Sequence, residues 1–208
     1  DEAVSSDYLD SSDVYVYYTK DSEGEFTTPR IAVVVEDGEI TEVRGISDPE
    51  QNVEPEFFDI VEEKLDEFYH DKKFDNMLKD MRRVYNIISS DDVSLDDLKF
   101  IYEVDSNINY FGRDKDFEIA RFLRTRDKKK DYGVMYGCPS ALVGDSYSDL
   151  FDDIYLYLGD IVINDEVLPE GFHCPAIVLG DFEAPYLVSS SGLESLYYVK
   201  KDLVVSSI

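Results

Sequence analysis

The chain has 208 residues, enough for one large domain or two small ones, and its 43% hydrophobic content predicts a packed core. Its longest aliphatic run, at 31–35, is far too short to span a membrane. The net charge of −27 comes from the two ends, 1–70 and 136–208, whereas acids and bases balance over 71–135. This field disfavours nucleic acid and anionic membranes as partners. It favours a basic protein surface, although solubility alone would also account for it.

The first 45 residues predict an antiparallel meander of three strands after a loose lead-in over 1–12. The segment "DVYVYYTK" at 13–20 is rich in Val and Tyr, which favour strands. The almost wholly apolar run at 30–36 predicts a central strand. The "DG" at 37–38 is a strong hairpin signal, so the segment at 39–45 is expected to pair with the strand before it.

Helical spacing begins after Pro55 and predicts helices over about 57–69, 74–88, 94–102 and 115–126. Ser94 with "SLDD" is a capping-box variant at the start of the third helix. His70 is expected at the end of the first, where the helix dipole favours a cation. The basic cluster from Arg121 to Lys130 is assigned in the same way to the end of the fourth helix, with a docking patch as the alternative.

A repeat marks the C-terminal part of the chain. Asp160, Asp181 and Asp202 recur at steps of 21, and short β-rich apolar segments surround each of them. A fixed period of about twenty residues with short strands is typical of a solenoid rung. We therefore expect β-solenoid repeats over 141–208, with the three aspartates in one column. The last strand, 203–208, leaves an open edge that further rungs, a partner chain or the N-terminal region would cover.

Together these patterns predict an α+β fold with two domains. The first, 1–140, combines an N-terminal antiparallel sheet with strands to about 45 and a helical segment over about 55–126. The second, 141–208, is a short solenoid with rungs of about 21 residues, which the native protein is expected to continue. Self-association through the C-terminal strand edge is a further expectation.

The motifs "PRIA", "EVRG", "QN" and "YEVDS" give a resemblance that covers about 13–140. In their order they resemble an uncharacterised bacterial family from candidate-phylum and metagenomic genomes. The resemblance implies that longer members continue into tandem β-solenoid repeats and carry an upstream segment with Trp, Cys and Thr, which this chain lacks. It implies no established activity. The matching positions are Pro29, Arg30, Glu42, Arg44, Gly45, Gln51, Asn52, Tyr102, Glu103, Asp105 and Gly112.

Candidate site residues are few because no phosphate loop, dinucleotide fingerprint or metal-ligand pattern is present. No cofactor and no metal are therefore expected. Neither His70 nor His173 has a nucleophile pattern beside it, and Cys138 and Cys174 are read as idle thiols. Arg30 and Arg44 are expected to form ion pairs with Glu42 or with acids such as Glu103 and Asp105, and an anion clamp is the alternative. The binding candidates are Arg30, Arg44, Gln51, Asn52, Glu103 and Asp105.

Two function classes remain open. The first is a non-catalytic acidic protein-binding module, such as an inhibitor, immunity or anti-defence factor, that engages a basic partner. The alternative is part of an enzyme whose catalytic cysteine lies in the absent upstream segment, so whether the protein is an enzyme stays uncertain. The cysteine usage demands no oxidising compartment, and we expect a cytoplasmic location.

Overall fold

The structure is a computed structural model that describes residues 2–4, 12–47, 49, 51–113, 115–163, 170–185, 196 and 198–206. The chain forms two compact units, 1–125 and 126–208. The division therefore falls before residue 126, whereas the sequence placed a domain boundary near 140. Helix α5, Lys128–Tyr136, packs on the 3₁₀ turn and strand that follow it, and so it belongs to the second unit. No helix among the described residues is long and apolar enough to cross a membrane.

The first unit contains a sheet of strand order β1-β2-β3-β4-β5, with bounds Glu2–Val4, Ser12–Lys20, Phe26–Glu36, Glu39–Gly45 and Tyr69–His70. Strands β2, β3 and β4 form the antiparallel meander that the sequence predicts. Asp37 and Gly38 join β3 to β4 with φ of 50° and 83°, the left-handed conformations that a tight hairpin requires.

Two short strands at the sheet edges differ from the sequence prediction. Strand β1 pairs antiparallel with β2, although 1–12 was expected to be a loose lead-in. Strand β5 pairs parallel with β4 and contains His70. The expectation that His70 ends a helix is wrong, because helix α1 stops at Glu67 and Phe68 is already extended.

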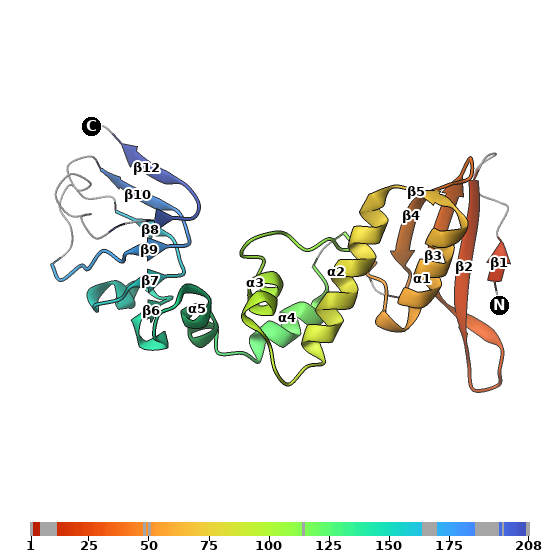
Figure 1. The fold of residues 1–208 in the computed structure, drawn as a ribbon, viewed down its shortest axis with the longest axis horizontal. Coiled ribbons are helices and arrows are strands. Elements are labelled where there is room, and N and C mark those ends of the chain that lie inside the picture. Colours follow the sequence, from red (N-terminus) through yellow and green to blue (C-terminus); the bar gives the residue numbers. More distant parts are fainter. Residues whose placement is uncertain are drawn as a thin grey trace. The chain divides into compact units, whose positions relative to one another are not determined.

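The helices of the first unit are η1 (Pro55–Phe57), α1 (Phe58–Glu67), α2 (Lys72–Ile88), α3 (Leu95–Ile101) and α4 (Phe117–Arg124). Side-chain caps set three of the starts. The oxygens of Asp71, Ser94 and Asp116 accept backbone N–H groups at the beginning of α2, α3 and α4. Helix α1 lies across one face of the sheet (Figure 1).

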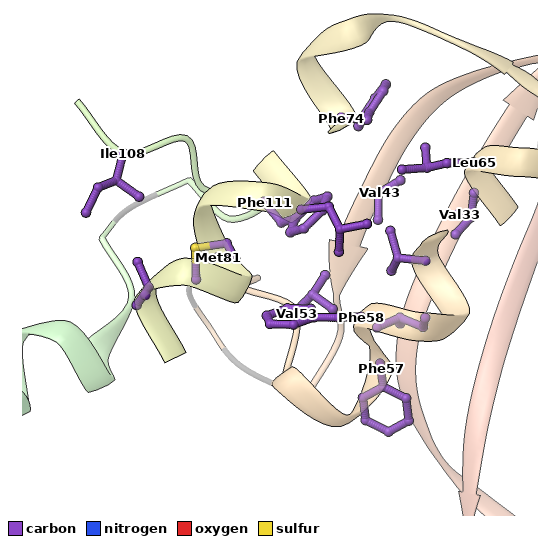
Figure 2. Packing of buried hydrophobic residues seen from close by; sticks show 14 of the residues in the cluster. Val33, Val43, Val53, Phe57, Phe58, Leu65, Phe74, Met81, Ile108 and Phe111 are labelled. Carbon is purple, nitrogen blue, oxygen red and sulfur yellow. The ribbon is translucent and has the colours of Figure 1, made fainter. Parts of the chain in front are cut away.

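One core joins the sheet to these helices. Val33 and Val43 of the sheet pack with Leu65 of α1 and Met81 of α2 (Figure 2), and all four side chains are 4% exposed or less. Val53 belongs to the same cluster and is 1% exposed. Burial of Val53 fixes the loop between β4 and η1 against the core, which places the polar residues of that loop.

The second unit begins with α5, which the sequence analysis did not predict. Asp127 caps α5 by accepting the N–H of Lys130 at 3.1 Å. The lysines at 128–130 therefore lie at the start of a helix, and their assignment to the C-terminal end of the preceding helix is wrong. Neighbouring carboxylates offset the unfavourable dipole there, since Lys129 Nζ lies 3.0 Å from Asp149 and 3.1 Å from Asp145.

The rest of the second unit consists of short strands in two parallel sheets, with two 3₁₀ turns, η2 (Ser140–Leu142) and η3 (Tyr147–Phe151). One sheet has the order β11-β9-β7-β6 and the other β12-β10-β8. Figure 1 shows the strands layered on one another. Their bounds are Val143–Gly144 (β6), Leu156–Tyr157 (β7), Ile161–Val162 (β8), Ile177–Val178 (β9), Phe182–Pro185 (β10), Tyr198–Val199 (β11) and Leu203–Ser206 (β12).

The register of these strands repeats the spacing found in the sequence. Leu156 pairs with Ile177 and Ile177 with Tyr198, so each step is 21 residues, and β8, β10 and β12 follow the same step. The N–H of Asp181 donates to Asp160 Oδ1 at 2.8 Å, and the N–H of Asp202 donates to Asp181 Oδ1 at 3.1 Å. The three aspartates are therefore in register, each accepting the backbone of the next layer.

Candidate functional site

The loop between β4 and η1 brings several of the motif residues together. The N–H of Gly45 donates to the carbonyl of Gln51 at 2.9 Å, which closes the loop at its base. A Cβ on Gly45 would lie 1.9 Å from the carbonyl oxygen of Asn52, so glycine is required by this close approach. Gln51 has φ of 62°, a conformation that non-glycine residues adopt at some energetic cost.

Asn52 connects this loop to the segment that precedes α4. Its side chain is 3% exposed, and its Oδ1 accepts the N–H of Gly112 at 3.0 Å. A buried amide with such a partner stabilises two loops against each other, because losing the partner would leave a desolvated polar group. Gly45, Gln51, Asn52 and Gly112 are thus adjacent in space, and their contacts are those of a scaffold.

The two arginines each contact a carboxylate. Arg30 pairs with Glu54 and lies 3.9 Å from Glu56, so the expected pairing with Glu42, Glu103 or Asp105 is wrong for Arg30. The sequence could not identify Glu54 because many acids surround each cation in a chain with 47 Asp and Glu residues. The guanidinium of Arg30 also lies 5.6 Å from the ring centre of Phe57.

Arg44 pairs with Glu42 at 3.3 Å, as predicted. Both side chains are at least 40% exposed, and a pair so accessible to water contributes little to stability. Arg44, Gly45 and Gln51 line a hollow of about 480 Å³ on one side of the loop. Of the residues that line this hollow, Arg44 is the one with a positively charged side chain.

Glu103 and Asp105 lie in the turn after α3 and have different surroundings. Glu103 accepts the N–H of Ile108 at 3.1 Å and forms an ion pair with Lys115, so it organises the turn. Asp105 lies 3.8 Å from Lys99, and it lines a separate hollow of about 270 Å³. The contacts described for these two binding candidates are with residues of the segment 99–115 and not with the loop that contains Gln51 and Asn52.

An open cavity of about 640 Å³ adjoins the same loop and shares Ser47 and Pro49 with the hollow beside Arg44. Its walls come from the loop, from η1, from α2 and from the start of α4. The residues that line it are Ser47, Pro49, Asn52, Val53, Glu54, Pro55, Glu56, Tyr85, Ile88, Asp116, Phe117 and Glu118. We call it the acidic groove, because four of these side chains are carboxylates and none is a cation.

The carboxylates of the acidic groove differ in how far hydrogen bonds and ion pairs within the chain neutralise their charge. Asp116 is 4% exposed and accepts the N–H of Glu118 at 2.8 Å and the hydroxyl of Tyr85 at 2.9 Å. Glu54 contacts Arg30, and Glu118 contacts Arg121 at 3.1 Å. Glu56 is 64% exposed and 3.9 Å from Arg30, so it presents its charge to solvent.

Phe117 is an exposed aromatic side chain beside these carboxylates. It is 53% exposed at the first position of α4, directly after the cap residue Asp116. The sequence analysis did not select Asp116 or Phe117 as site residues, because it began the fourth helix at about 115 and so placed both inside the helix. The cap pattern of Asp116, with Glu118 in the first turn, is the signal that could have identified them.

Tyr110 is a half-buried phenol whose pKa is affected by burial first and by two nearby carboxylates second. Burial, and then the charges of Asp116 and Asp80, raise the pKa of Tyr110 to about 12. Its phenol therefore stays neutral at physiological pH. Both like-signed carboxylates act in the direction expected for a negative field on this side of the unit.

The remaining groups with reactive chemistry lie outside the groove. His70 Nε2 is 3.0 Å from Asp75 and its Nδ1 is 3.1 Å from the carbonyl of Phe68, with no nucleophile in these contacts. Cys138 and Cys174 belong to the second unit and form no disulfide within the described residues, and burial raises the pKa of the Cys138 thiol. Within the described ranges, no cluster of His, Cys, Asp and Glu could hold a metal ion.

No protein-family model matches the chain, and neither the curated proteins nor the solved structures give a match to it. The functional argument therefore depends on the groove and on the charges of this chain.

Proposed function

We propose that the protein is a non-catalytic, acidic protein-binding module that engages a basic partner through the acidic groove. The observation that carries the proposal is the combination of four carboxylates with an exposed Phe117 around one open cavity. Carboxylates attract Lys and Arg side chains, and an aromatic face adds a cation–π contact of about 0.5–1 kcal/mol at an exposed site. A basic protein segment is the ligand that uses both features.

The use of cations elsewhere in the chain supports the same proposal. Many Lys and Arg side chains already have carboxylate partners within their own unit. Examples are Arg82 with Asp59 and Glu62, Arg83 with Asp97, Lys115 with Glu103, Arg126 with Asp131, and Lys129 with Asp145 and Asp149. With a net charge of −27, the remaining acids give a field that steers a basic protein toward the surface. An inhibitor, immunity or anti-defence factor would use such a field to occupy a basic surface that normally holds nucleic acid.

We also propose that the second unit is a short β-solenoid that serves as a rigid extension of the module. The constant step of 21 residues in both parallel sheets supports this proposal. Gly180 supports it too, since a Cβ there would lie 2.2 Å from the carbonyl oxygen of Gly159, one layer away. Buried Leu156, Val178 and Phe182 provide the apolar interior that stacked rungs need.

Two expectations from the sequence stay proposals. A cytoplasmic location agrees with two cysteines that form no disulfide within the described residues, because disulfides are rare in a reducing compartment. The enzyme alternative depends on a cysteine outside residues 1–208, so no residue described here carries it.

The experiment that tests the binding function measures anisotropy of a fluorescent oligolysine peptide titrated with the full chain. Glu56→Gln should weaken binding by about two- to fivefold, the usual value of one exposed charge pair. Phe117→Ala should weaken it by a similar factor through loss of the ring. Glu23→Gln is the matched control, because it removes the same charge from an exposed turn between β2 and β3.

Comparing the groove variants with Glu23→Gln shows whether the peptide binds at the groove or is attracted only by the overall negative charge. If Glu56→Gln and Glu23→Gln weaken binding equally, and Phe117→Ala leaves it unchanged, the groove is not the binding site. Absence of any binding by the parent chain at low salt would reject the function itself.

A further inference from the structure

Two of the four carboxylates of the acidic groove already have donors on both oxygens. In Glu54, Oε1 accepts the hydroxyl of Ser47 at 3.2 Å and Oε2 contacts Arg30. In Asp116, Oδ1 accepts a backbone N–H at the start of α4 and Oδ2 accepts the hydroxyl of Tyr85 at 2.9 Å. These two side chains therefore have little capacity left for the cation of a ligand.

The other two carboxylates, Glu56 and Glu118, remain accessible to a ligand. Glu56 lies on η1, is 64% exposed and is 3.9 Å from its nearest cation. Glu118 lies on α4 and contacts Arg121 through one oxygen, Oε2, at 3.1 Å. A carboxylate can accept several donors, so this pair leaves room for another N–H. Phe117, the exposed ring of the groove, directly precedes Glu118.

An aromatic ring with two accessible carboxylates suits a guanidinium better than an ammonium. A guanidinium is flat, so its face can stack on a ring while its edge donates N–H groups to carboxylates. It is also more weakly hydrated than an ammonium, which is a compact charge that holds its water strongly. This difference matters in a groove that is open to solvent.

The chain contains the same combination at another place. The guanidinium of Arg83 lies 4.2 Å from the ring centre of Phe100, and its Nε and Nη2 donate to Asp97 at 3.1 Å and 2.8 Å. Arg83 is partly exposed, so this arrangement forms where water competes for the cation. Lys64 also contacts a ring and a carboxylate, but it is buried, so water does not compete there.

We propose that the acidic groove selects arginine, with a guanidinium of the basic partner stacked on Phe117 and donating to Glu118 and Glu56. This inference rests on the proposed binding function and names the side chain that the groove recognises. A lysine in the same place keeps the attraction of the carboxylates but gains less from the ring. The partner segment is therefore one that contains arginine, and positive charge alone is not sufficient.

Two fluorescent peptides of equal length and charge, oligoarginine and oligolysine, test the inference when each is titrated with the full chain. We expect oligoarginine to bind about fivefold more tightly, the value of a cation–π contact at an exposed site. Phe117→Leu removes the ring but keeps an apolar side chain, and should reduce this preference to less than about twofold. Tyr147→Leu is the matched control, because it removes an exposed ring of the second unit and should leave the preference unchanged.

The comparison of the two peptides on the parent chain does not depend on any variant that folds. Equal affinity for both peptides would overturn the inference and leave the binding function in place. A preference that persists in Phe117→Leu, or that falls equally in Tyr147→Leu, would overturn it as well, because the ring in the groove would then not recognise arginine. Absence of binding by either peptide would reject the proposed function, and the inference with it.

Discussion

Gly45→Ala tests whether close packing of the β4–η1 loop shapes the acidic groove. The added Cβ would lie 1.9 Å from the carbonyl oxygen of Asn52 and 2.7 Å from its carbonyl carbon. Ordinary contact is about 3.4 Å or more, so the loop backbone must move by about 1.5 Å. Overpacking of this kind costs about 1–3 kcal/mol, and loss of the Gly45–Gln51 hydrogen bond adds about 1 kcal/mol.

The smaller conformational entropy of the unfolded variant offsets about 0.4–1 kcal/mol of this cost, which leaves a destabilisation of about 1–3.5 kcal/mol with a central value of about 2 kcal/mol. Urea denaturation followed by far-UV circular dichroism measures it, and with a slope of about 2 kcal/mol per molar the midpoint should fall by about 1 M. Gly24→Ala is the control, because Gly24 has φ of 87° but nothing within 4 Å of an added Cβ. Its cost should be about 1 kcal/mol, from backbone conformation alone.

The reasoning about Gly45 would be refuted by an unchanged midpoint, or by a loss no larger than that of Gly24→Ala. At urea-free conditions, where the variant remains folded, a displaced loop should also reduce affinity for the oligolysine peptide. If Gly45→Ala loses the full stability but keeps its affinity for the peptide, the conformation of the loop does not determine binding at the groove.

Three further predictions concern other parts of the chain. Asp181→Ala removes the acceptor of the Asp202 N–H and should cost about 1 kcal/mol, whereas Asp152→Ala, an exposed acid of the same unit, should change the thermal midpoint little. Partial burial alone would lower the pKa of His70, but its hydrogen bonds with Phe68 O and Asp75 outweigh burial and raise it. The contribution of protonated His70 to the free energy of unfolding should therefore be complete below the ordinary pKa of about 6.5 and be lost as pH rises through the raised pKa. Denaturation measured at a series of pH values should show a weaker pH dependence for Asp75→Asn than for the parent chain. Duplex DNA should not be shifted in a gel by the pure protein, since the net charge repels it, and a clear shift would contradict the electrostatic account.

The sequence predicts much of the first unit because its signals are local. Alternating Val and Tyr residues and the Asp37–Gly38 turn determine β2, β3 and β4 without help from distant residues. The edge strands were missed since two or three residues form a strand only when a partner is in place, as for His70 beside Ile40. Helix α5 was missed because its lysines were taken as the cationic end of α4, so the cap Asp127 was not recognised.

The site was less predictable than the fold because its contacts join residues far apart in the chain. Asn52 meets Gly112, and Arg30 meets Glu54, through loops whose paths no local pattern fixes. With so many acids, spacing cannot select the one that faces a given arginine. The regular step of 21 residues is the exception, since one repeated interval predicts the register of Asp160 and its equivalents over long distances.

The affinity of the intact chain for the oligolysine peptide, measured from low salt to well above physiological ionic strength, tests the central claim most directly. At about 0.15 M salt, charges are screened beyond about 8 Å, so exposed carboxylates lose much of their attraction for a cationic partner. We predict measurable binding at low salt and a steep fall in affinity as salt rises, with Glu56→Gln giving a shallower slope than Glu23→Gln. An affinity that does not change with salt, or no binding at any salt concentration, would contradict the account of an acidic binding module.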